Sequence, residues 1–149
     1  MSGQVTAGRG HPQQANPAQI MTASVTLSSA QILAADTVPI AVVPASGPGR
    51  VCNIITSFYQ LVFGTAAYVG GPGGLLYGDD TGGTADSGDN SIMINTESSL
   101  TASFGDVANT LAQMVNLPVV YGVPTGSTPY TEGDGTLRIT VLYVIEDVS

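Results

Sequence analysis

Two stretches near opposite ends of the chain alternate regularly between apolar and polar side chains. In the first, Thr22–Leu27, the apolar residues Ala23, Val25 and Leu27 are separated by hydroxyl side chains. In the second, apolar residues occupy every other position, namely Leu137, Ile139, Val141, Tyr143 and Ile145. Alternation with a period of two is typical of a strand that buries one face. We therefore predict a strand in each stretch, the second of them long.

Shorter apolar runs between glycine and proline clusters predict further strands, at residues 40–43, 50–63, 75–77, 91–95 and 117–123. Pro118 places the last of these at a sheet edge or at a strand start. Ser28–Ala35 is typical of one helical turn, capped by Ser28 or Ser29, with Ile32 and Leu33 facing inward. The apolar spacing in 100–115 fits a helix over part of the window and leaves the type of element open. Many short strands joined by turns indicate an all-β protein, a jelly-roll-like β-sandwich.

The first twenty residues contain Gly, Pro and Gln and almost nothing that could be buried. We predict that residues 1–21 form an extended, flexible N-terminal arm and that residues 22–149 form a single β-sandwich domain. Two alternatives remain for the arm: a disordered end, or a segment that becomes ordered on a neighbouring subunit. No signal peptide is recognisable and no apolar run is long enough to cross a bilayer, so we expect a soluble protein without a membrane partner.

The charged residues of the chain exclude more classes of function than any motif does. The chain has no lysine, three arginines and eleven acidic residues, for a net charge of -8. A nucleic-acid surface needs clustered cations, so we expect no nucleic-acid partner. The single histidine, His11, lies in the arm, and the single cysteine, Cys52, lies in an apolar run where we expect it to be buried. With no base beside a nucleophile and no His/Cys cluster, we predict neither an enzyme nor a bound cofactor or metal.

Carboxylates offer the remaining candidate chemistry. The segment 78–90 holds Asp79, Asp80, Asp86 and Asp89 among Gly, Thr and Ser, which predicts an exposed loop. It is either a solvated acidic loop or a site for a hard cation such as calcium, although its spacing does not match a helix–loop–helix calcium site. Glu132 and Asp134 could form a hydrolytic pair, but both are also typical of hairpin turns. The glycine-rich 70–74 lacks the lysine of a phosphate loop, so we interpret it as a turn.

Exposed tyrosines can act as anchors in protein interfaces. Tyr68 and Tyr130 each follow small residues in predicted loops, although a position in the core is the alternative. Together with polar and rigid residues of the arm, they make up the candidate partner-binding set: Arg9, His11, Pro12, Pro17, Tyr68 and Tyr130.

Four segments carry a resemblance to a known family: Thr22–Val51, Thr65–Gly71, Leu76–Gly78 and Gly133–Tyr143. They resemble small structural proteins encoded in the head-gene regions of tailed bacteriophages. The chain is similar in length and texture to the jelly-roll cement proteins of short-tailed phages. The arm lies outside the resemblance, and segments 78–90 and 96–116 match no part of it.

The resemblance implies a capsid decoration (cement) protein on the outer capsid surface of the virion. Such a protein would bind the major capsid protein, stabilise the mature shell by bridging neighbouring subunits, and form a homodimer or homotrimer. The alternative function is a head-fibre or tail module that binds host-surface glycans. A cluster of exposed aromatic side chains at one loop end would favour that alternative.

Overall fold

The computed structural model describes residues 19–78, 96–105 and 114–148. One short helix, α2 (Ser29–Leu33), accompanies the strands. The strands are β1 (Met21–Leu27), β2 (Ile40–Val43), β3 (Arg50–Val62), β4 (Val69–Gly71), β5 (Gly74–Tyr77), β6 (Leu100–Gly105), β7 (Val119–Gly122), β8 (Thr128–Glu132) and β9 (Thr136–Asp147). The predicted strand 91–95, the predicted loop 78–90 and the arm up to residue 18 lie outside the described residues.

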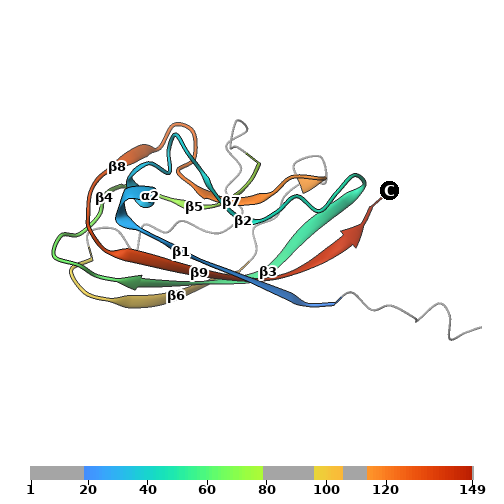
Figure 1. Ribbon diagram of the computed structural model, residues 1–149, viewed down its shortest axis with the longest axis horizontal. Helices are drawn as coiled ribbons and strands as arrows, with labels where there is room; N and C mark the ends of the chain where they lie inside the picture. The colour runs from blue at the N-terminus through green and yellow to red at the C-terminus, as the bar shows by residue number, and fades with distance from the viewer. Residues whose placement is uncertain (1–18, 79–95, 106–113, 149) are drawn as a thin grey trace, which may run out of the picture.

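The strands form two layers with a small strand pair at one end (Figure 1). Sheet A contains four strands in the order β1-β9-β3-β6, and sheet B contains three in the order β2-β7-β5. The strand pair is β4-β8. One apolar core fills the space between the layers, with fully buried side chains from both sheets, among them Leu27, Tyr59, Leu75, Tyr121 and Ile139. The prediction of an all-β sandwich is confirmed.

Strand β9 organises sheet A because it pairs with two strands that come much earlier in the chain. Its antiparallel register places Ile139 opposite Val25 of β1 and Tyr59 of β3. Leu137, Ile139 and Val141 are buried while the residues between them face outward, as the alternation predicted. A bulge at Ile55 of β3 interrupts the second register, and the Ile55 side chain is exposed.

The predicted helical turn is present and its cap is complete. Ser28 is the N-cap: its hydroxyl accepts a hydrogen bond from the Gln31 backbone N–H, and the Gln31 side chain accepts one from the Ser28 N–H. This reciprocal pair is a capping box, which satisfies backbone donors that a five-residue helix cannot pair internally. Ile32 is buried in the core and Leu33 packs against it.

Successive strands cross from one layer to the other. Along the chain, β1, β3, β6 and β9 belong to sheet A, and β2, β5 and β7 fall between them in sheet B. Strands that alternate between two sheets bring distant parts of the chain into contact, as in the pairing of Met21 with Tyr143. The jelly-roll topology itself stays a prediction, as does the division into an arm and a single domain.

The structure corrects three local predictions and decides one that was left open. In the window 100–115, residues Leu100–Gly105 form strand β6, and residues 106–113 are outside the described part. Pro118 precedes β7 as a strand start, but among the described strands β7 lies between β2 and β5, so the edge alternative is wrong. Residues 70 and 71 of the glycine-rich segment 70–74, which was interpreted as a turn, belong to β4. Met21, assigned to the arm, already pairs in sheet A.

Candidate partner-binding surface

The described residues offer little that could perform chemistry. Within the three described ranges, no group of three or more His, Cys, Asp and Glu side chains is placed to hold a metal ion. Cys52 is fully buried, as predicted. None of the helices in those ranges has the length and hydrophobicity needed to span a bilayer. The exposed surfaces of the described residues are therefore the candidate sites.

The outer face of sheet A is the broadest such surface, because no described helix or strand lies on the side of this sheet away from sheet B (Figure 1). The register of the paired strands determines which residues lie side by side in rows across this face. Thr26, Arg138, Gln60 and Thr101 lie side by side across the four strands, and Ser24, Thr140, Phe58 and Ser103 form the next row. Neighbouring strands are about 4.8 Å apart and alternate residues on a strand about 6.7 Å, so polar groups are regularly spaced on this face.

We call this surface the hydroxyl face, because most of its side chains are Thr or Ser. Its members are Thr22, Ser24, Thr26, Thr56, Phe58, Gln60, Val62, Thr101, Ser103, Thr136, Arg138, Thr140 and Leu142. Three of them form a hydrogen-bonded chain across β1 and β9. The Arg138 Nε donates to the Ser24 hydroxyl at 3.2 Å, and the Ser24 and Thr140 hydroxyls are 3.1 Å apart.

Apolar side chains are exposed beside these hydroxyls. On β3, Phe58 is 41% exposed and Val62 is 52% exposed, and both project from the hydroxyl face. Phe58 is a large apolar group that water solvates poorly, so covering it would be favourable. The hydroxyls next to it could exchange water for hydrogen bonds to a partner.

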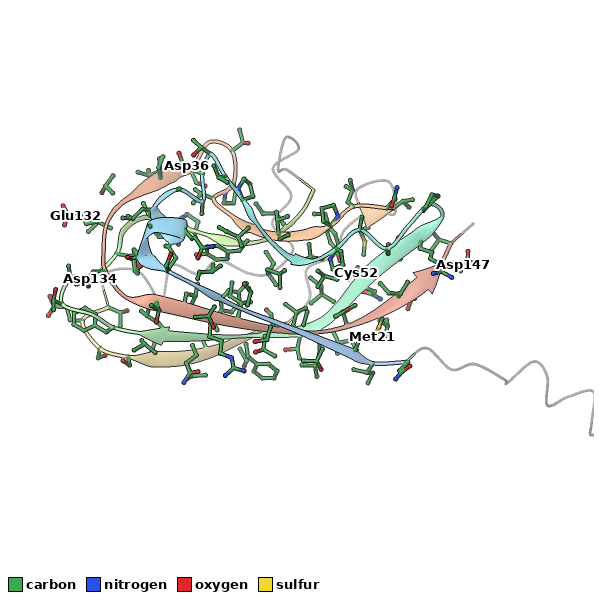
Figure 2. All side chains as sticks on the ribbon, in the orientation of Figure 1. Met21, Asp36, Cys52, Glu132, Asp134 and Asp147 are labelled. Carbon is green, nitrogen blue, oxygen red and sulfur yellow. The ribbon has the colours of Figure 1, made fainter. Side chains whose placement is uncertain are left out.

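The hydroxyl face contains no carboxylate, although the chain carries a net charge of -8. Among the described acidic side chains, Glu132 and Asp134 lie at one end of the sandwich, Asp147 at the other and Asp36 beyond sheet B (Figure 2). Glu146 is at an outward position of β9, but beyond the residues that pair with β1. The one charged group in the rows of the hydroxyl face is the guanidinium of Arg138. Because its rows across the four strands carry no negative charge, this is where an acidic partner can approach the molecule with least repulsion.

The sequence left two positions open for Tyr68 and Tyr130, an exposed anchor or the core, and the structure places both in the core. Their side chains are 5% and 7% exposed, and their rings pack edge to face with centroids 5.7 Å apart. The Tyr68 hydroxyl donates to the Gly135 carbonyl at 2.6 Å, and the Tyr130 hydroxyl accepts from the Gly73 N–H at 2.8 Å. Burial, with the nearby Asp134 and Tyr130, raises the pKa of Tyr68 to about 12. Both rings are therefore parts of the core that brace the surrounding loops.

Gly133 explains why Tyr68 can pack so closely. The Tyr68 ring occupies the position that a Cβ atom on residue 133 would need, and Gly133 has a φ of 118°. Only glycine satisfies both conditions without strain. The turn after β8 and the tyrosine ring are thus fitted to each other.

Asp134 also has a structural role. Its carboxylate accepts hydrogen bonds from the backbone N–H of Thr65, the Thr65 hydroxyl and the N–H of Ala66. These bonds lower the pKa of Asp134. The carboxylate is therefore engaged in holding the 64–66 loop, and the turn interpretation of 132–134 accounts for it. The candidate calcium ligands of 78–90 lie outside the described residues.

The structure does not bring the predicted partner-binding residues together. Arg9, His11, Pro12 and Pro17 lie outside the described residues, and their role stays a prediction. The exposed residues that the sequence analysis missed are those of β3, above all Phe58. The signal was available in the polar outward positions Thr56 and Gln60, which alternate with buried Ser57 and Tyr59 and so mark Phe58 as outward-facing.

Comparison with known proteins gave one structural likeness. No family model matches the chain, and no curated protein matches it. Among solved structures, a chain of the Cyanophage Pam1 capsid asymmetric unit is similar, with a TM-score of 0.46 and 16% sequence identity. The likeness covers 87% of this chain and 91% of that one. A similarity of this size carries no argument about function, which has to rest on the surfaces described above.

Proposed function

We propose that this protein is a bacteriophage capsid decoration (cement) protein that binds the outside of the mature shell and stabilises it by bridging neighbouring capsid subunits. The observation that carries the proposal is the hydroxyl face of this strongly acidic molecule. No described helix or strand covers this broad sheet surface, and its rows across the four strands hold no carboxylate. The family resemblance of segments such as Thr22–Val51 supports it. In this proposal the protein has no catalytic role and its partner is the major capsid protein.

The size of the hydroxyl face sets how it can work. Four strands about 4.8 Å apart and about six residues long give a face of roughly 400 Å². A stable interface buries about 800 Å² on each partner. One copy bound through this face alone would therefore be held weakly. Tight binding would need a further contact, which we assign to the arm, or the coupling of several copies in a homodimer or homotrimer.

The arm is placed well to supply that contact. Residues 1–18 precede β1, which is an edge strand of sheet A. An extended chain of this length could reach roughly 60 Å. We infer that the arm crosses onto an adjacent capsid subunit while the hydroxyl face rests on the first. Arg9, His11, Pro12 and Pro17 would then contact the second subunit.

Cosedimentation of the purified protein with shells stripped of it tests the proposal. Saturable binding at a copy number set by the icosahedral symmetry of the shell, together with greater resistance of the shell to heat, is the expected result. A protein lacking residues 1–18 should keep its melting temperature and bind more weakly, since its first strand starts at Met21. Binding of only a few copies per shell would refute the decoration role.

A head-fibre or tail module that binds glycans is the second candidate. The described residues do not add support for it, because the two loop tyrosines that could have formed an aromatic cluster are buried. Phe58 is the only aromatic side chain among the exposed large hydrophobic residues of the described ranges. A glycan-array measurement with specific, saturable binding would favour this candidate over the decoration role.

A further inference from the structure

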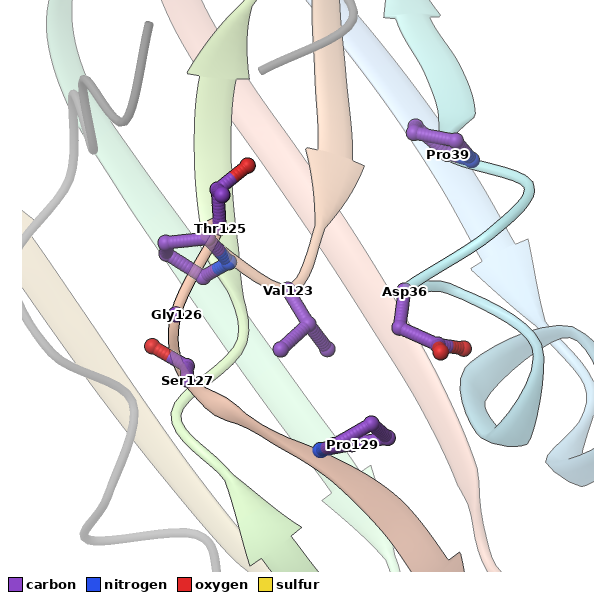
Figure 3. A pocket seen from close by; sticks show the side chains of 8 residues that line it. Asp36, Pro39, Val123, Thr125, Gly126, Ser127 and Pro129 are labelled. Atoms are coloured by element: carbon purple, nitrogen blue, oxygen red, sulfur yellow. The ribbon is translucent and has the colours of Figure 1, made fainter. Parts of the chain in front are cut away.

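A small pocket lies on the sandwich away from the hydroxyl face, between the loop that follows α2 and the turn that joins β7 to β8 (Figure 3). Its volume is about 260 Å³. Small-molecule sites usually measure about 300–1,000 Å³. The pocket is therefore of a size to receive one amino-acid side chain.

The walls of the pocket are held in place by backbone hydrogen bonds. The Val123 N–H donates to the Ala35 carbonyl at 3.3 Å and joins the two walls. The Ser127 N–H donates to the Pro124 carbonyl at 2.9 Å and closes the 124–127 turn. On the other wall, the Val38 N–H donates to the Ala34 carbonyl at 2.8 Å. A pocket fixed in this way needs little reorganisation to bind a partner.

The lining combines proline and valine side chains with the hydroxyl residues Thr125 and Ser127 and one carboxylate. Pro39, Pro124 and Pro129 supply rigid rings, and Val123 lies at the base, only 7% exposed. Asp36 is exposed, and its side chain lies on the same side as those of Val123 and Pro129 (Figure 3). No residue of the described part gives the Asp36 carboxylate a hydrogen bond or an ion pair. Proline rings beside one carboxylate and two hydroxyl residues suit a side chain with an aliphatic stem and a cationic end that donates hydrogen bonds.

The described part of the chain does not provide such a cation. There is no lysine, Arg138 is engaged with Ser24 on the hydroxyl face, and Arg50 begins β3. The remaining arginine, Arg9, lies outside the described residues. The strong acidity of the molecule would in addition draw a basic partner toward it.

We propose that this pocket binds an arginine side chain presented by another protein, with Asp36 pairing with the guanidinium and the three prolines contacting its stem and plane. Arginine fits better than lysine because its guanidinium is planar, is weakly hydrated and offers several donors to a carboxylate. If the protein decorates a capsid, the arginine belongs to a capsid subunit. Only this last step rests on the proposed function.

Titration of the full-length protein with N-acetyl-arginine amide, followed by backbone amide NMR, tests the pocket without a capsid. We expect saturable shifts in the millimolar range at Val123, Thr125, Gly126 and Ser127. N-acetyl-citrulline amide, which has nearly the same shape without the charge, should bind several-fold more weakly. The Asp36→Asn variant should lose the preference for arginine over citrulline. The Glu132→Gln variant, which removes an exposed acid elsewhere, should keep this preference.

Equal shifts with arginine and citrulline, or unchanged binding by Asp36→Asn, would overturn the proposal. The Arg9→Gln variant, with no ligand added, should have the same chemical shifts at the pocket amides as wild type. A change in those shifts would show that the chain's own Arg9 fills the pocket, and would also overturn the proposal. The capsid step has its own readout. If wild-type protein cosediments with shells, Asp36→Asn should bind several-fold more weakly than Glu132→Gln. If wild type does not cosediment, the decoration role fails while the arginine titration still decides the pocket.

Discussion

Asp134 and Thr65 are joined by two hydrogen bonds to one carboxylate: the Thr65 N–H donates to Oδ1 at 2.7 Å, and the Thr65 hydroxyl donates to Oδ2 at 2.5 Å. With the Ala66 N–H, which also donates to Oδ1, they attach the loop after β3 to the turn before β9. Because all three donors favour the ionised carboxylate, they lower its pKa in the folded protein.

This lowered pKa predicts an acid-dependent stability. The contribution of Asp134 is fully present above its unfolded pKa of about 3.9 and is lost as the pH falls through the lower, folded-state value. We expect Asp134→Asn to reduce the melting temperature at pH 7, and we expect this difference from wild type to begin to shrink below about pH 4. Glu132→Gln, two residues away and exposed, should have the melting temperature of wild type both at pH 7 and below pH 4. A constant difference across the pH range would contradict the role given to the carboxylate.

Tyr68 predicts a second pH dependence, at the alkaline end. Its pKa is raised to about 12, so its contribution to stability is fully present below the unfolded value of about 10 and is lost as the pH rises through 12. Tyr68→Phe removes the hydrogen bond to Gly135 and should cost about 1 kcal/mol at neutral pH. Urea unfolding should show this difference shrinking above pH 10, since phenylalanine does not ionise. A gap that stays constant would show that the hydroxyl titrates normally.

Ser57 predicts a stabilising substitution. It is fully buried between the sheets, and its hydroxyl finds no hydrogen-bond partner among the described residues. A buried hydroxyl without a partner loses its bonds to water and gains none in return. We expect Ser57→Ala to raise the free energy of unfolding by about 1 kcal/mol, measured by chemical denaturation. Ser24→Ala, which removes a bonded hydroxyl from the outer face, should instead be neutral or slightly destabilising.

Phe58 separates stability from shell binding. Phe58→Ser should change the free energy of unfolding by no more than about 1 kcal/mol, because the ring is 41% exposed. Its binding to stripped shells should fall several-fold. Val69→Ser offers a matched control, since Val69 is also 41% exposed but lies on β4, outside sheet A. Equal losses for the two variants, or none for Phe58→Ser, would remove the hydroxyl face from the proposed contact.

Local patterns were the most reliable guide to the fold. The alternation in Thr136–Glu146 predicted both the strand and its buried side, and Ser28, one of the two predicted caps, is the N-cap of the helix. Both signals depend on residues close together in the chain. The interior position of β7 was missed because Pro118 suggests an edge when the neighbouring strands are unknown.

The candidate surface was harder to predict for the same reason. Tyr68 and Tyr130 follow small residues, a pattern that allowed an exposed loop as well as the core. The core around Tyr68 is completed by Gly133 and Gly135, from a turn more than sixty residues later in the chain. The hydroxyl face likewise exists only once β1, β3, β6 and β9 are aligned in register. Its members lie from Thr22 to Thr140, and none of them is unusual by itself.

The central position of β9 has a consequence for how the protein is made. This strand is the partner of both β1 and β3, yet it is synthesised after every other described strand. During synthesis, β1 and β3 leave the ribosome before β9, so β1 lacks its partner strand and β3 lacks its longest strand pairing. Sheet A therefore closes only after release of residues 136–147, and contacts so far apart in sequence form slowly. Until then the nascent chain presents open strand edges, on which aggregation or a chaperone can act.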